Sequence, residues 1–140
     1  MPTSAFTKFN DFVVQRDKGV HDFSSHAFKV ALTNTAPSTS NTVLTDITQI
    51  AAGGGYSAGG YTVTVTESGS AGTSKVFVAN ATITATGAAI ATFRYVVLYN
   101  NTSSGKNLIG WLDYGSALNL ADGEALALQF DQTNGLLSTT

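Results

Sequence analysis

Two strongly apolar segments, residues 93–99 and 108–114, flank the polar octapeptide NNTSSGKN, and this pair constrains the fold more than any other feature of the chain. A strand with one face in water alternates polar and apolar side chains, whereas these segments are apolar on both faces. We expect them to form an antiparallel hairpin. Both faces of that hairpin then need cover, one from a second sheet and the other from a helix, a loop or another subunit.

Symmetric pairing about the polar loop predicts the register of this hairpin. It places Tyr99 opposite Leu108 and Arg94 opposite Asp113, which are the only cation of the first segment and the only anion of the second. A slip of one residue would move these charges to opposite faces, so an Arg94–Asp113 pair supports this register. The other expected pairs are Leu98 with Ile109, Val97 with Gly110, Val96 with Trp111, Tyr95 with Leu112 and Phe93 with Tyr114.

The start of the chain has a helical spacing of apolar residues, followed by a glycine at a typical helix end. This pattern predicts a short amphipathic helix over residues 6–18, which either covers the core or docks as an arm on a neighbouring subunit. The residues concerned are Phe6, Phe9, Phe12, Val13 and the terminating Gly19.

The rest of the chain is predicted to be short strands separated by Gly, Ser, Asn and Thr. Residues 34–41 and 67–74 are expected to be loops, residues 42–50 to hold one helical turn, and residues 51–60 to form an exposed glycine loop with positive φ. The expected strands besides the hairpin are 28–32, 61–66, 75–79, 81–85, 124–131 and a short one at 136–137. We therefore predict one all-β domain over residues 1–140, a jelly-roll-like antiparallel β-sandwich (20–140) preceded by an arm with a short N-terminal helix (1–19).

The composition of the chain argues against several classes of function. Charged residues are 11% of the chain and the formal net charge is −2, without the basic stripe that nucleic-acid binding needs. There is no cysteine, hence no disulfide and no thiolate nucleophile or ligand, and no apolar run approaches the ~20 residues of a membrane span. We expect a soluble protein that binds neither nucleic acid nor membrane, with a charge-poor surface typical of proteins covered by partners.

No motif in the chain indicates chemistry. His21 and His26 would need a third ligand to hold a metal, so we expect a surface or turn role for them. Ser24 and Ser25 beside them lack a nucleophile elbow, so their position next to the histidines does not indicate catalysis. The glycines at 53–55 and 59–60 fit no phosphate-binding loop, and Asp122-Gly-Glu is too short for a calcium loop. We expect no catalytic residue, no cofactor and no metal.

Three segments carry a resemblance to a family: FKVALTNTAPSTSNTVLTDITQIAAGGGYSAGGYTVTVT, FRYVVLYNNTSSGKNLIGWLDYG and LNLADGEALALQFDQTNGLL. Together they resemble small phage structural proteins of the capsid cement or decoration type. The resemblance implies a virion protein on the capsid surface, assembled in the bacterial host cytoplasm, which clamps the major capsid protein as a dimer or trimer. No residue-level motif carries that role.

The first hypothesis is therefore a cement protein that works by binding and not by catalysis. The alternative is a glycan- or receptor-binding module of a phage tail fibre, for which exposed aromatic side chains would form a stacking platform; an enzyme is the third. The residues expected at an interface are the aromatic and apolar side chains of the predicted helix and hairpin: Phe6, Phe9, Phe12, Val13, Tyr95, Tyr99, Trp111 and Tyr114.

Overall fold

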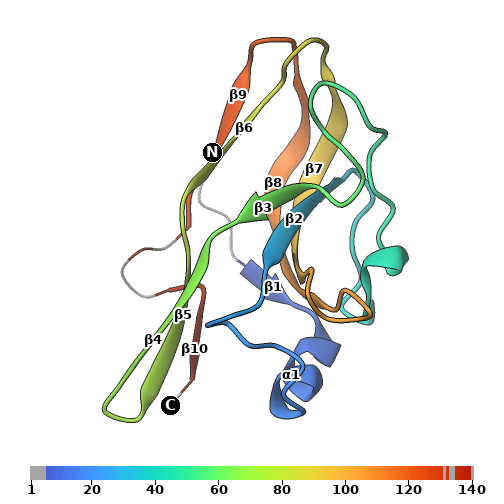
Figure 1. Cartoon of the computed structure of the whole chain (residues 1–140). Coiled ribbons are helices and arrows are strands. Elements are labelled where there is room, and N and C mark those ends of the chain that lie inside the picture. The colour runs from blue at the N-terminus through green and yellow to red at the C-terminus, as the bar shows by residue number, and fades with distance from the viewer. Residues whose placement is uncertain (1–5, 131, 133–134, 140) are drawn as a thin grey trace.

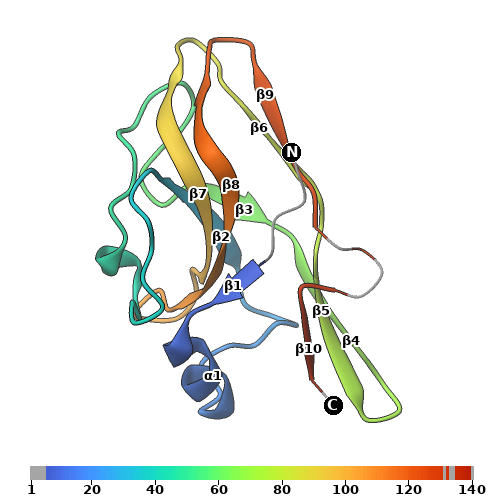
Figure 2. The same cartoon turned by 180° about the vertical axis from the view of Figure 1, so that it is seen from behind.

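The computed structural model describes residues 6–130, 132 and 135–139, and it is built almost entirely from antiparallel strands (Figures 1 and 2). A five-stranded sheet has the order β1-β8-β7-β2-β3, a three-stranded sheet the order β10-β5-β4, and β6 pairs with β9. This confirms the expected sandwich-like all-β class with one short α-helix. The elements are β1 (Phe6–Lys8), α1 (Asn10–Asp17), β2 (Phe28–Thr33), the 3-10 helix η1 (Leu44–Asp46), β3 (Tyr61–Val63), β4 (Val65–Ser70), β5 (Thr73–Val78), β6 (Ala81–Thr84), β7 (Ile90–Asn100), β8 (Leu108–Leu120), β9 (Ala125–Leu128) and β10 (Leu137–Thr139).

The main core lies between the five-stranded sheet and the layer formed by the other strands. It contains Phe28 and Val30 from β2, Phe93 from β7 and Leu126 from β9, all buried. The alternation predicted for the end of the chain is confirmed, because Leu126, Leu128 and Phe130 are buried while the residues between them are exposed.

The predicted helix is shorter than expected. Residues 6–8 form strand β1, in which Phe6 pairs with Leu112, and the helix begins only at Asn10. The apolar spacing of residues 6–12 fits a helix, but a free strand edge on β8 gives the backbone of Phe6–Lys8 a partner that a helix would forgo. The helix ends as predicted, because Gly19 has a φ of +79°.

The β7–β8 hairpin forms, and its predicted register is right only next to the loop. Tyr99 pairs with Leu108 as expected, but the next pair is Leu98 with Gly110, so Ile109 is an extra residue on β8. Such a β-bulge shifts every later pair by one position. The expected pairs from Leu98–Ile109 to Tyr95–Leu112 are therefore wrong.

The β7–β8 ladder has a second irregularity, which lies next to Arg94 and concerns the predicted Arg94–Asp113 ion pair. Phe93 pairs with Leu118 and not with Tyr114, and Tyr95 lies opposite Asp113. Arg94 nonetheless reaches Asp113 diagonally, with Nε 2.8 Å from Oδ1 and the second nitrogen 3.1 Å from Oδ2. The predicted contact is confirmed although the direct pairing that predicted it is not.

Residues 61–66 form two strands instead of one. β3 pairs with β2 and β4 pairs with β5, so the chain crosses from one sheet to the other at Thr64. The expected loop at 67–74 is mostly strand, with a turn of only Ala71 and Gly72, both at positive φ. Positive φ at both central positions is the type I′ turn that suits the twist of a tight hairpin.

The glycine-rich segment 51–60 is a loop with positive φ, as predicted, but it is not wholly exposed. Tyr56 within it is buried, and its hydroxyl accepts the backbone N–H of Leu32 (3.1 Å) and donates to Oε1 of Gln49 (2.7 Å). Burial raises the pKa of Tyr56 to about 12. At Gly60, with φ +80°, an added Cβ would collide with the carbonyl oxygen of Val30.

Candidate interaction surfaces

The second face of the β7–β8 hairpin is covered by the chain itself. Val97, Tyr99 and Leu108 on this face pack with Phe9 and with two residues of the loop after β2, Leu44 and Ile47. The hydroxyl of Tyr99 donates to the carbonyl of Gly59. Of the covers expected for this face, which were a helix, a loop or another subunit, the structure provides the loop after β2 together with Phe9.

This packing places the eight expected interface residues in three groups. Phe9, Phe12 and Tyr99 are buried and belong to the protein's own core. Val13 is exposed, although the spacing put it on the buried face of a helix. The other four are half-buried: Phe6, Tyr95, Trp111 and Tyr114.

The two histidines meet at Asn100, the last residue of β7. The Asn100 side chain is fully buried, and its Oδ1 accepts the backbone N–H groups of Thr102 (2.9 Å) and Ser103 (3.2 Å). Its amide nitrogen therefore faces Nδ1 of His21 (3.2 Å) and Nδ1 of His26 (2.9 Å). Through these contacts the Asn100 side chain links the segment before β2, which carries both histidines, to the loop between β7 and β8. Its role is therefore structural.

The contact with Asn100 also indicates which nitrogen of the neutral His21 ring carries the hydrogen. The amide nitrogen of Asn100 can only donate, so Nδ1 of His21 accepts from it and the ring hydrogen lies on Nε2. Burial, and next the charge of His26, lower the pKa of His21 to about 4. Its Nε2 is buried without a hydrogen-bond partner in the described part of the chain.

Sequence reasoning treated Asn100 only as part of a polar loop. A usable signal was present, because an Asn at a strand end can accept the backbone N–H groups two and three residues on. What sequence could not show is that two histidines some 75 positions earlier would share its amide.

The serines beside the histidines do not form a catalytic arrangement. Ser24 and Ser25 donate their hydroxyls to Asp22, at 2.6 and 2.7 Å. These hydrogen bonds hold the pKa of Asp22 well below its usual range. The segment is a carboxylate-centred turn, and His26 at its end donates its backbone N–H to the carbonyl of Asp22. A surface role is wrong for His21, because its ring is buried next to Phe12.

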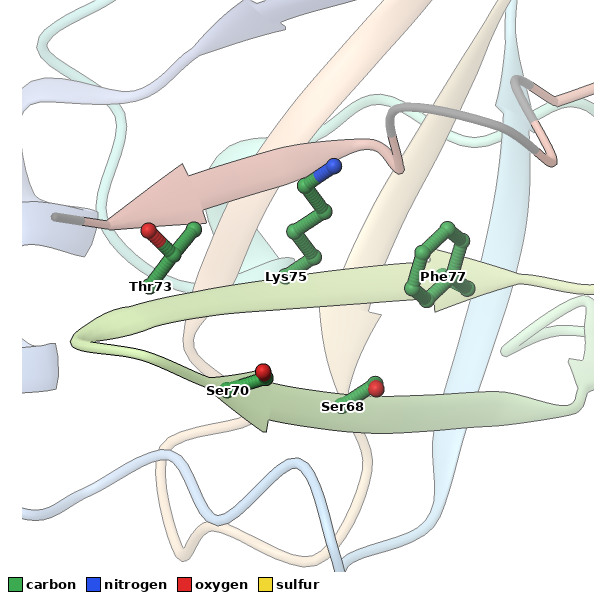
Figure 3. Close-up of a pocket in the computed structure, with 5 residues that line it drawn as sticks. All are labelled: Ser68, Ser70, Thr73, Lys75 and Phe77. Carbon is green, nitrogen blue, oxygen red and sulfur yellow. The ribbon is translucent and has the colours of Figure 1, made fainter.

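The clearest exposed feature is the β4–β5 hairpin, which projects from the body of the molecule in both views (Figures 1 and 2). One of its faces carries hydroxyls, one amine and one ring around a shallow hollow of about 430 Å³. Figure 3 shows its five lining residues on the two neighbouring strands: Ser68, Ser70, Thr73, Lys75 and Phe77. We call this surface the hydroxyl face.

A second exposed feature is an apolar pair on α1. Val13 is 39% and Val14 is 48% exposed, and they are the exposed large hydrophobic side chains among the described residues. Two adjacent exposed valines on one short helix form a small apolar contact point.

In the described residues, no three His, Asp or Glu side chains gather in a way that could hold a metal ion. No helix within residues 6–130 and the described end of the chain is long and apolar enough to cross a bilayer. Fold and surface together define an antiparallel, sandwich-like β-protein with a projecting hairpin. No protein-family model, curated protein or solved structure matches this chain.

Proposed function

We propose that the chain is a structural protein of a phage virion, a cement or decoration protein that binds the major capsid shell as a homo-oligomer. It acts through protein–protein contacts and not by catalysis. The observation that carries the proposal is the projecting β4–β5 hairpin, whose β4 residues from Thr66 to Ser70 are all exposed and include one charge, Glu67. The family resemblance of the sequence supports the same role.

The surface composition supports contact with other proteins. Interface cores are depleted in charged residues, and this chain has 11% charged residues over its whole length. The hairpin extends beyond the packed body, so it reaches a neighbouring molecule without rearrangement of the core (Figure 2). The valines on α1 add a second exposed surface, which is apolar, and buried apolar area contributes about 25 cal/mol per Å².

Many copies amplify a modest contact. A cement protein that bridges two shell subunits makes its second contact at high effective concentration, so small interfaces suffice to hold a shell together. Charged residues that would repel neighbouring copies at close spacing are few on this chain.

The test compares shells with and without the protein. Particles from which it has been removed should open at a lower temperature, measured by release of DNA to a fluorescent dye, and adding the purified protein back should restore the original temperature. Equal opening temperatures, with no binding of the purified protein to stripped shells, would eliminate the proposal.

A matched pair of variants locates the contact. Val14→Glu places a charge on the exposed apolar pair of α1, and Ala127→Glu places one at an exposed position of β9. We expect Val14→Glu to weaken binding to stripped shells by about tenfold, because it places an unpaired charge in the contact. Ala127→Glu should leave this binding unchanged.

The hydroxyl face favours a second candidate, a glycan-binding module of a tail fibre. Hydroxyls and a lysine beside the ring of Phe77 offer the mixture of polar groups and aromatic surface that sugars contact. Binding of the purified protein to cell-surface glycans of the host, lost in Phe77→Ala and accompanied by no affinity for shells, would favour this candidate over the first.

A further inference from the structure

β4 is an unusually open sheet edge. The strands that end the five-stranded sheet, β1 and β3, have three residues each, and so does β10 at the far edge of the three-stranded sheet. β4 has six residues and is paired on one side only among the described strands. Proteins protect free edges with short strands, proline, charged side chains or bulges, and of these β4 has only one charged residue, Glu67.

Backbone geometry shows which groups face outward from this edge. The carbonyl of Thr64 accepts the N–H of Ala79 across the hairpin (2.9 Å), and antiparallel pairs alternate along the ladder. Even-numbered residues of β4 therefore point their backbone groups toward β5. The N–H and C=O groups of Val65, Glu67 and Gly69 point away from it, toward the free edge.

We propose that β4 pairs antiparallel with β4 of a second copy, with Ser68 on the two-fold axis. Outward groups must pair with outward groups, so Glu67 faces either Gly69, another Glu67 or Val65 of the second copy. The register centred on Glu67 sets two like charges directly opposite, which is destabilising. The register centred on Ser68 places each carboxylate against a glycine.

That register also matches the side chains across the two-fold axis. Thr66 of one copy lies opposite Ser70 of the other, and Ser68 lies opposite Ser68, so hydroxyls face hydroxyls on the hydroxyl face. Cross-strand Ser and Thr pairs of this kind stabilise antiparallel sheets. The register centred on Thr66 would instead extend the pairing to Val63, which is buried and belongs to the other sheet.

The size of the edge sets the strength of the contact. In this register residues 66–70 of the two copies face each other, and five residues a side are far fewer than the about 20–30 residues a side of a stable interface. The pairing is therefore weak in dilute solution and forms where copies are crowded. It rests on the proposed function in this respect, because a shell covered by many copies supplies that crowding.

Cysteine crosslinking tests the register directly, because the chain has no cysteine of its own. In the proposed pair the two Ser68 residues are a non-hydrogen-bonded pair with Cα atoms about 4.5 Å apart, within the range of a disulfide. Under mild oxidation at high protein concentration, we expect Ser68→Cys to form disulfide dimers at least about tenfold faster than a control on the same strand, since pairing raises the effective thiol concentration.

Ser70→Cys is that control. It is exposed on the same strand and face, but the two Ser70 residues lie four positions apart along the paired strands, about 13 Å, which is beyond disulfide reach. A mixture of Thr66→Cys and Ser70→Cys should give mixed dimers at the faster rate. Equal rates for Ser68→Cys and Ser70→Cys, or dimers of neither at any concentration, would overturn the pairing.

The same variants separate this inference from the proposed function. Ser68→Cys protein that binds stripped shells without crosslinking on them overturns the β4 pairing and leaves the cement role standing. Crosslinking in solution without any binding to shells overturns the cement role and leaves the pairing standing.

Discussion

The stability of this protein should fall between pH 7.5 and pH 5 because of one residue, His21. Its pKa is about 4 in the folded protein and 6.5 in the unfolded chain. Below pH 6.5 the unfolded chain binds a proton that the folded protein does not, so stability decreases as the pH falls and the loss is complete below the folded pKa. Above pH 6.5 the contribution is fully present.

The structure gives the magnitude. A difference of 2.5 pKa units between the values 6.5 and 4 corresponds to about 3 kcal/mol, of which about 2 kcal/mol are lost between pH 7.5 and pH 5. The physical causes are the burial of His21 and the nearby charge of His26, opposed by Asp11. Protonation would also turn Nδ1 of His21 from an acceptor into a donor facing the amide of Asn100.

The assay is urea unfolding of the wild-type protein and of His21→Phe at both pH values. Phenylalanine keeps the ring that lies 5.2 Å from Phe12 and removes the buried, unpartnered Nε2, while His26 and the carbonyl of Val20 remain as acceptors for the Asn100 amide. We expect the variant to lose about 2 kcal/mol less than the wild type between pH 7.5 and pH 5. Equal losses in both proteins would refute the reasoning.

Two further substitutions test the packing that surrounds the candidate surfaces. Asn100→Ala leaves the N–H groups of Thr102 and Ser103 without their acceptor, so it should reduce the free energy of unfolding by about 2–4 kcal/mol, measured by urea unfolding at pH 7.5. A loss below about 1 kcal/mol would contradict the structural role of Asn100. Gly60→Ala puts a Cβ at a positive φ against the carbonyl of Val30 and should lower the thermal midpoint by an amount equivalent to more than about 1 kcal/mol, while Gly87→Ala, at positive φ but with open space around it, should lower it less.

Local pattern predicted the strands well where one face is buried and the other is exposed. The alternation in residues 61–66 and 124–130 gave the correct buried faces, since a period of two follows from strand geometry alone. The positive φ of the glycine loop and the helix end at Gly19 were likewise predictable, because only glycine adopts that conformation at no steric cost.

The same reasoning failed where a distant segment changed the outcome. Residues 6–8 have the spacing of a helix, yet the edge of β8 pairs with them as a strand. The hairpin register slipped by one because Ile109 bulges out of the ladder, and its carbonyl accepts the N–H of Phe9 (3.1 Å) instead. Neither partner is near in sequence, so no local pattern could predict either result.

The predicted interface shows the same difference between what local pattern predicts and what distant segments decide. The sequence predicted an interface on the N-terminal helix and on the aromatic side chains of the hairpin, because the hairpin is apolar on both faces. The structure buries that second face under Leu44 and Ile47 of the same chain and leaves the polar strand β4 exposed in its place.

By itself, the sequence determined an all-β chain with paired apolar strands, flexible glycine turns and few charges, because strand period and backbone freedom are local properties. Only the tertiary structure decided which apolar face the chain covers for itself and which strand edge it leaves open. Burial and pairing at those places depend on segments that meet only after folding, and the free energy of each contact exists only once both partners are in place.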